Sequence, residues 1–117
     1  MKPKYNFFAN WGYALAGLGA MVKNEASFRA ELAIVLPALV VDFFLPLTLL
    51  EHLFLGAVLV IILVVECLNS AVEACVDLVT KEFHPLAKVA KDCGSAAVFL
   101  TISLAVVSWA VVLLRLL

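Results

Sequence analysis

Four polar side chains recur at helical spacing in this chain, directly after a long uncharged stretch. The thirteen residues at 53–65 (LFLGAVLVIILVV) carry no charge, and Glu66, Asn69, Glu73 and Asp77 follow them. At about 100° per residue, these four side chains fall within about 80° of arc on one face of a helix. An ionisable residue inside a membrane span opposes insertion by about 2.5–3.5 kcal/mol and by default marks a functional site. Glu66 is therefore the first candidate for a functional residue.

The spacing of these residues suggests a particular chemistry. A carboxylate in an apolar phase can exchange protons near neutral pH, and Glu66 has that setting. Carboxylates near water bind Mg²⁺ and, with it, nucleotide phosphates, which suits Glu73 with Asn69 beside it. Lys91, next to the start of a helix, would favour phosphate oxygens. Together these residues predict phosphoryl transfer from a water-soluble donor to a hydroxyl held in the membrane, catalysed mostly by positioning and charge neutralisation.

Each of these residues also has a purely structural interpretation. Glu66 and Asn69 could join neighbouring helices by hydrogen bonds. Glu73 and Asp77 could simply form the polar end of a helix that leaves the membrane, and Lys91 could set the topology. The sequence contains no Walker loop and no protein-kinase signature. A small ion-coupled transporter subunit, with Glu66 as proton carrier, is the alternative of a different functional class.

The composition predicts an all-α integral membrane protein. Hydrophobic residues make up 66% of the 117 residues, and the mean hydropathy is +1.15. A soluble domain has roughly 45–50% apolar residues. We predict one domain over residues 1–117, in which an N-terminal amphipathic helix at 5–29 precedes membrane helices at 32–50, 53–80 and 96–114.

The N-terminal segment is too mixed in polarity to span a membrane. Trp11, Leu15, Leu18 and Val22 recur at i, i+4, i+7 and i+11, which is the pattern of an apolar helical stripe. A helix lying in the membrane interface and a helix packed on its own bundle are both consistent with this stripe.

The connection between the second and third membrane helices is predicted to be a polar loop at 81–91. Pro85 interrupts the helical run. Asp92 could cap the third helix, and Gly94 and Ser95 would open it.

Basic residues indicate the orientation of the chain. They lie before the first span and between the second and third, whereas none lies between the first and second. By the positive-inside rule, the N-terminus and the 81–91 loop are cytoplasmic. The residues counted are Lys2, Lys4, Lys23, Arg29, Lys81, Lys88 and Lys91.

Three short spans leave little interior in which to hide Glu66. A monomer would expose this side chain to lipid, whereas an oligomer can bury it between chains. We therefore expect a homo-oligomer with sites at its subunit interfaces.

Three stretches of the sequence resemble the signature stretches of the small prokaryotic diacylglycerol kinases. They read NEASFRAE at 24–31, ECLNSAVEACVD at 66–77 and AKDCGSAAV at 90–98. The resemblance covers nearly the whole chain. It implies a multi-pass homotrimer of the bacterial inner membrane with active sites shared between subunits. Such an enzyme uses ATP and Mg²⁺ to phosphorylate diacylglycerol to phosphatidic acid, and its partners are ATP, the lipid and the bilayer, with no nucleic acid.

The resemblance also implies a role for individual residues. Glu66 matches the catalytic base, and Glu25 and Glu73 match the metal ligands. The residues that match the nucleotide and cofactor side are Tyr13, Glu25, Asn69, Glu73, Glu82, His84, Lys91 and Asp92. The residues that match the lipid-substrate side are Ser27, Arg29, Glu31, Glu66 and Ser95.

The identity of the lipid alcohol depends on finer features of the sequence. Gram-positive relatives of the same family phosphorylate undecaprenol. The NEASFRAE and GSAAV stretches are more similar to the Gram-negative diacylglycerol type. Undecaprenol kinase is therefore the alternative within the same class.

Overall fold

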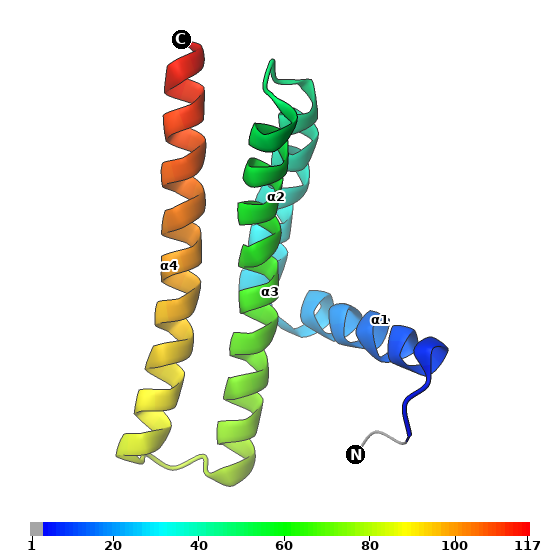
Figure 1. Ribbon diagram of the computed structural model, residues 1–117. Coiled ribbons are helices and arrows are strands. Elements are labelled where there is room, and N and C mark those ends of the chain that lie inside the picture. Colours follow the sequence, from blue (N-terminus) through cyan, green and yellow to red (C-terminus); the bar gives the residue numbers. More distant parts are fainter. Residues whose placement is uncertain (1–3) are drawn as a thin grey trace.

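The computed structural model describes residues 4–117, so Lys2 of the basic residues counted above lies outside the described part. Within it the chain forms only helices: α1 (Phe7–Asn24), α2 (Ala26–Phe44), α3 (Leu49–Val79) and α4 (Pro85–Leu116). Figure 1 shows α3 and α4 side by side over their whole length, with α2 against one half of α3 and α1 projecting sideways from the lower end of α2. The prediction of an all-α protein is confirmed.

The most extensive interface joins α3 to α4, and α2 packs on α3. Its buried centre consists of Val58 and Ile62 of α3 and Ala105 of α4, with Ile102 and Trp109 packed against them. The small side chain of Ala105 lets the two helices approach closely at this level. The core is therefore an antiparallel helix pair to which α2 adds a partial third layer.

The first helix ends earlier than the sequence predicted. The predicted boundary at residue 29 is wrong, because Glu25 has extended backbone angles (φ −114°, ψ 106°) and separates α1 from α2. The last carbonyl groups of a helix lack partners within the helix. Here the guanidinium of Arg29 donates to the carbonyl oxygens of Val22 and Lys23, at 2.9 and 3.1 Å. This side chain satisfies the end of α1 and fixes the bend.

The turn between α2 and α3 also differs from the prediction of helices at 32–50 and 53–80. The second helix ends at Phe44, because Leu45 precedes Pro46 and is extended (φ −78°, ψ 148°). The third begins at Leu49 through a capping box, in which Thr48 and Glu51 exchange side-chain and backbone hydrogen bonds of 3.1 and 3.2 Å.

The last helix begins eleven residues before the predicted residue 96, so the prediction of a polar loop up to residue 91 is wrong. His84 caps α4, since its Nδ1 accepts from the backbone N–H of Leu86 at 3.1 Å. Pro85 occupies the first helical position, where its missing N–H costs nothing. Lys91, Asp92, Gly94 and Ser95 consequently all lie within α4 rather than before it or at its start.

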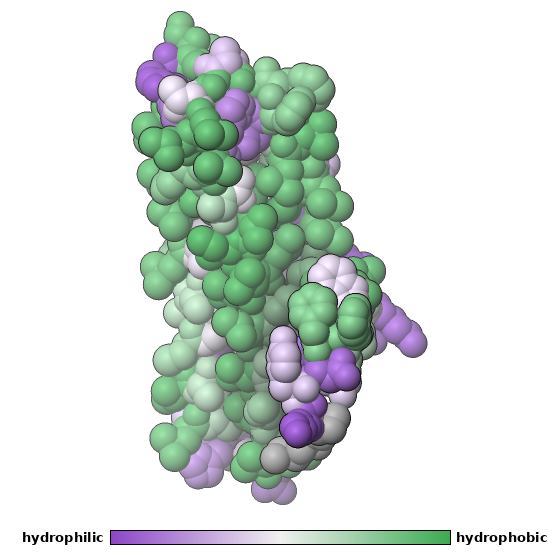
Figure 2. Space-filling view, turned by 45° about the vertical axis from the view of Figure 1, so that its right-hand side comes forward, coloured by the Kyte–Doolittle hydropathy of each residue, from purple (hydrophilic) through white to green (hydrophobic). Residues whose placement is uncertain are grey.

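Within residues 4–117, α3 and α4 are the helices long and apolar enough to cross a membrane. The nineteen residues of α2 include three charged side chains, Arg29, Glu31 and Asp42. Figure 2 shows hydrophobic side chains over the middle of the bundle, with hydrophilic ones gathered toward its two ends and on α1.

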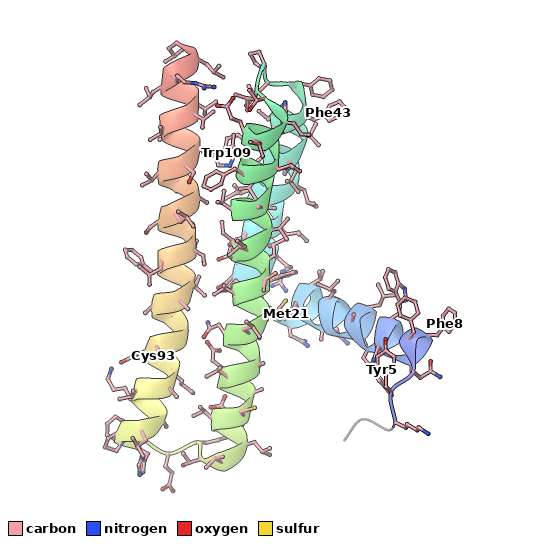
Figure 3. All side chains as sticks on the ribbon, in the orientation of Figure 1. Tyr5, Phe8, Met21, Phe43, Cys93 and Trp109 are labelled. Carbon is pink, nitrogen blue, oxygen red and sulfur yellow. The ribbon has the colours of Figure 1, made fainter. Side chains whose placement is uncertain are left out.

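The apolar stripe of α1 does not pack on the bundle within a single chain. Trp11, Leu15, Leu18 and Val22 are all exposed, and the buried residue of α1 is Met21. Figure 3 shows Met21 where α1 meets the other helices, and the labelled aromatic side chains at the far end of α1. The stripe is therefore free to meet a membrane surface or another chain.

Asp42 and His52 tie α2 to α3 near the turn that joins them. Asp42 is buried, and its Oδ1 lies 3.0 Å from Nδ1 of His52. Because the partner of Asp42 lies on the following helix, no local sequence pattern marks this pair.

The capping box can be tested by substitution. We expect Thr48→Ala to lower the free energy of unfolding by about 1 kcal/mol, because the first turn of α3 loses its side-chain acceptor. Thr48→Ser keeps the oxygen and should stay close to the wild type. Unfolding in detergent micelles followed by circular dichroism measures the difference, and equal stability of the two variants would contradict the assignment.

Candidate functional site

Glu66 lies in the interior of the helix bundle. Its side chain is 5% exposed, although it carries an ionisable group and sits on the most apolar helix of the chain. Asp42 is the other buried acidic residue within residues 4–117, and it has His52 as a partner. Glu66 forms no ion pair with a Lys, Arg or His within residues 4–117, so in this part of the chain its buried carboxylate lacks a counter-ion.

Three further carboxylates lie within electrostatic reach of Glu66. Glu25 comes from the bend between α1 and α2, Glu31 from the second turn of α2, and Glu73 from α3 two turns after Glu66. No ion pair joins any of the four to a Lys, Arg or His in the described part of the chain. The bend of the chain at Glu25 therefore creates a concentration of negative charge that the sequence spacing alone does not display.

A basic residue from α4 approaches the same end of α3. The Nζ of Lys91 donates to Oδ1 of Asp77 at 2.8 Å and is also within electrostatic reach of Glu73. Asp92 lies on an exposed part of α4, where it pairs with Lys88 one turn earlier at 2.6 Å. Of these two neighbouring residues, Lys91 thus pairs with α3, whereas Asp92 pairs within α4.

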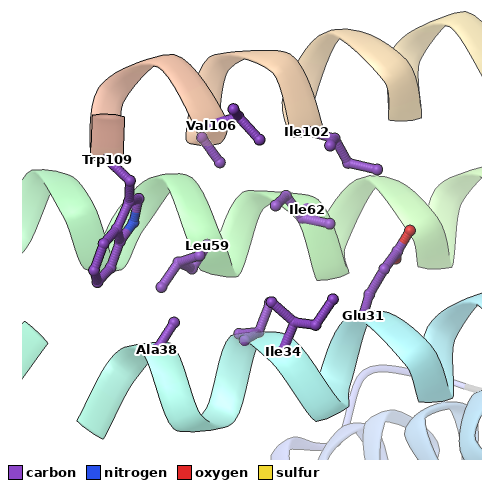
Figure 4. A pocket seen from close by; sticks show the side chains of 10 residues that line it. Glu31, Ile34, Ala38, Leu59, Ile62, Ile102, Val106 and Trp109 are labelled. Carbon is purple, nitrogen blue, oxygen red and sulfur yellow. The ribbon is translucent and has the colours of Figure 1, made fainter. Parts of the chain in front are cut away.

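Between α2, α3 and α4 the chain forms an apolar groove of about 360 Å³. Figure 4 shows Glu31 at one end of this groove and Trp109 at the other, with aliphatic side chains between them. The Oε2 of Glu31 is buried and accepts no hydrogen bond within residues 4–117. The indole Nε1 of Trp109 donates to the carbonyl oxygen of Leu55 at 3.4 Å, which closes the groove at its far end.

Comparison with known proteins decides the family. The model of the prokaryotic diacylglycerol kinase family matches residues 12–113, which include the whole of α2 and α3 and most of α1 and α4. The chain belongs to this family.

Curated relatives agree with this assignment. The kinase is 45% identical to the diacylglycerol kinase of Pseudomonas aeruginosa over 103 residues, which cover 88% of this chain and 84% of the relative. It is 42% identical to the diacylglycerol kinase of Escherichia coli K12 over 102 residues, or 87% and 84% of the two chains. The undecaprenol kinase of Bacillus subtilis is 33% identical over 92 residues, or 79% of this chain and 75% of the relative.

The carboxylates of the kinase fit Mg²⁺ as a companion of a nucleotide. Within residues 4–117 no three His, Cys, Asp or Glu side chains converge as a self-sufficient metal site. Mg²⁺ bound with a nucleotide needs only one or two carboxylates, since phosphates and waters supply the remaining ligands. Glu25 and Glu73, both partly buried and both acting on Glu66, meet that requirement.

Four of the residues predicted for the nucleotide side line one polar pocket. This pocket of about 450 Å³ lies where α3 passes into α4, and it is lined by Lys81 and Lys88 together with Glu82, His84, Lys91 and Asp92. Asn69 and Glu73 do not line it, and they lie closer to Glu66 along α3. The predicted nucleotide-side residues therefore divide into a pocket at the helix connection and a group on α3.

The remaining predicted residues are exposed in the single chain. Tyr13 is exposed on α1, Ser27 is exposed on the first turn of α2, and Ser95 is exposed on α4. The guanidinium of Arg29, also exposed, donates hydrogen bonds to carbonyl oxygens at the end of α1. Glu66, by contrast, is buried.

Two parts of the site could not be found from the sequence alone. The groove depends on which side chains of three helices face one another, and its one sequence signal is Trp109 within an uncharged run. The close contact between Asn69 and Gly94 likewise depends on the register of α3 against α4.

The role of Arg29 at the bend can be tested directly. Arg29→Gln removes the guanidinium that binds the last carbonyl groups of α1, so we expect the end of that helix to open more often. A loss of about 1 kcal/mol corresponds to roughly fivefold faster hydrogen–deuterium exchange in its last two turns. Lys23→Gln removes a neighbouring positive charge without those hydrogen bonds and serves as the control. Equal exchange in the two variants would show that Arg29 does not hold the bend.

Proposed function

We propose that this chain transfers the γ-phosphoryl group of ATP to the hydroxyl of diacylglycerol, giving phosphatidic acid and ADP. The observation that carries the proposal is the buried carboxylate of Glu66, which shares one face of α3 with Asn69 and Glu73. One turn after Glu66, Asn69 meets α4 at Gly94. A lipid hydroxyl and a nucleotide phosphate come from different phases, so their site must begin in an apolar interior and end in water.

In the proposed reaction, Glu66 accepts the proton of the lipid hydroxyl. The hydroxyl oxygen forms a bond to the γ-phosphorus, and the bond from that phosphorus to the bridging oxygen of ADP breaks. The proton passes to a carboxylate oxygen of Glu66, and ADP leaves with the bridging oxygen. Burial suits Glu66 to this task, because a carboxylate in an apolar setting holds a proton more readily than one in water.

Glu25 and Glu73 would hold Mg²⁺ together with the phosphates of ATP. When bound, the ion neutralises the charge that develops on the phosphoryl oxygens. The two carboxylates would also orient the nucleotide toward Glu66, since they approach that residue from α3 and from the bend before α2.

The rest of the nucleotide would be bound by the polar pocket at the helix connection and by the group on α3. Lys91 is suited to a phosphate because its ammonium is already held at the α3–α4 contact by Asp77. Asn69 offers an amide beside the phosphates. Tyr13, Glu82, His84 and Asp92 complete the proposed nucleotide side.

The lipid alcohol would approach Glu66 along residues of α2 and α4 that come before the apolar stretch of each helix. Glu31 stands at the end of the apolar groove and within electrostatic reach of Glu66. Ser27, Arg29 and Ser95 complete the proposed lipid side, with Arg29 also holding the bend of the chain.

We place the enzyme in the bacterial inner membrane with α2, α3 and α4 as spans and the N-terminus in the cytoplasm. The proposal draws on the distribution of lysine and arginine residues, because most of them lie before α2 or around the α3–α4 connection. Nucleotide-binding residues and ATP then lie on the same side of the membrane.

A homotrimer with shared sites would complete the carboxylate cluster. The proposed occupant of the apolar groove is another copy of this chain, which would cover Glu31 and the exposed face of α4. The large apolar exposure of α4, on which Ala105 is the buried residue, supports this arrangement. It would also bring Tyr13, Ser27 and Ser95 of one chain toward Glu66 of another.

The two alternatives differ in the support they have. Undecaprenol kinase shares the family, but the relative with that name is 33% identical, against 42–45% for the diacylglycerol kinases cited above. A proton-carrying transporter subunit has no need of the KDCGSAAV run at 91–98. Diacylglycerol is therefore the preferred acceptor.

Phosphorylation in mixed micelles tests the proposal. We expect the purified chain, given ATP and Mg²⁺, to phosphorylate diacylglycerol with a kcat/KM at least roughly tenfold above that for undecaprenol. A preference for undecaprenol would select the alternative within the family. If neither substrate yields a phosphorylated lipid, kinase activity toward both is rejected.

Substitution of Glu66 tests the proposed base. Glu66→Gln keeps the shape of the side chain but cannot accept the proton, so turnover should fall by about 10²–10⁴-fold while nucleotide binding persists. Glu51→Gln, at the opposite end of α3, is the control and should retain turnover per folded enzyme. Wild-type turnover in Glu66→Gln would remove this residue from the mechanism.

A further inference from the structure

The amide of Asn69 occupies a tight position between α3 and α4. Asn69 lies one turn after Glu66 and one turn before Glu73 on the same face of α3. Its Oδ1 is buried and accepts no hydrogen bond within residues 4–117. Hydrogen bonds to that oxygen therefore do not fix the amide, and its position depends on the shape of the surface it packs against.

That surface is the backbone of α4 at Gly94. A Cβ added to Gly94 would overlap Oδ1 of Asn69 and would lie 3.1 Å from its Cγ and 3.8 Å from its Cβ. The other four glycines of the chain differ in this respect. At Gly56 an added Cβ would make ordinary contacts of 3.7 and 3.8 Å, and at the three glycines of α1 it would meet nothing within 4 Å.

The backbone conformation of Gly94 does not explain the glycine. It lies in the third turn of α4, and none of the described glycines has a positive φ. A glycine inside a helix is unfavourable compared with alanine. The structural reason for a glycine here is the space that its missing side chain leaves for Asn69.

We propose that Gly94 is a positioning residue of the kinase reaction, acting through Asn69. By lacking a side chain, it lets the Asn69 amide lie against α4, level with the turn between Glu66 and Glu73. The inference rests on the proposed function, which places this amide beside the nucleotide phosphates. Because the atom that collides is the tip of a flexible side chain, an added methyl group rotates the amide away from its place and leaves the two helices together.

A double-mutant cycle separates this role from a general packing role. We expect Gly94→Ala and Asn69→Ala each to lower kcat/KM for Mg·ATP at least roughly tenfold, because a misplacement of about 1 Å can cost up to about a hundredfold. In the double variant the two losses should not multiply, since Gly94 has no further effect once the amide is gone. Gly56→Ala is the matched control and should stay within about twofold of the wild type.

Thermal unfolding in detergent provides a second readout that does not depend on turnover. If the added methyl group collides with the amide strongly enough to lower the midpoint of Gly94→Ala, the Asn69→Ala substitution should restore it. Wild-type kcat/KM in Gly94→Ala, multiplied losses in the double variant, or a lowered midpoint that Asn69→Ala fails to restore would each overturn the proposal. Failure of the proposed function is distinguishable, because it would appear as absent turnover in the wild-type chain.

Discussion

The close antiparallel packing of α3 on α4 is the constraint on which the rest of this structure depends. A surface ion pair lies at each of its ends, Lys91 with Asp77 at one end and Arg115 with Glu51 at the other. The two partners on each helix are separated by about 36–39 Å at 1.5 Å per residue. Between these pairs, the buried contacts of Val58 and Ile62 with Ala105 set the register. This register brings the polar part of α4 to the level of the carboxylates on α3.

The same packing gathers negative charge that a further component can neutralise. Glu25, Glu31 and Glu73 each interact electrostatically with Glu66, and no Lys, Arg or His within residues 4–117 forms an ion pair with any of the four. Like charges in an apolar interior destabilise a folded chain unless they are protonated or neutralised. A site built this way favours a divalent cation, which the proposed Mg²⁺ that accompanies ATP would supply. Stability and function are thus connected through one set of carboxylates.

Sequence periodicity predicted the elements but not their ends. An uncharged run and the spacing of Glu66 and Glu73 were enough to predict α3 and the face that carries the chemistry, because helical geometry fixes both. The boundaries depend on single hydrogen bonds made by Arg29, Thr48 and His84, each of which competes with other local conformations. The α3–α4 contacts and the apolar groove depend on register between helices, which no local pattern contains.

In the proposed function, Glu73 and Glu25 hold a divalent ion next to Glu66. Mn²⁺ replaces Mg²⁺ in oxygen-ligand sites and can be followed by electron paramagnetic resonance as it binds the enzyme with a non-hydrolysable ATP analogue. We expect Glu73→Gln to weaken Mn²⁺ binding at least roughly tenfold, since a neutral amide replaces a charged ligand, whereas Glu51→Gln leaves it unchanged. Equal Mn²⁺ affinity in wild-type enzyme and Glu73→Gln would contradict the account.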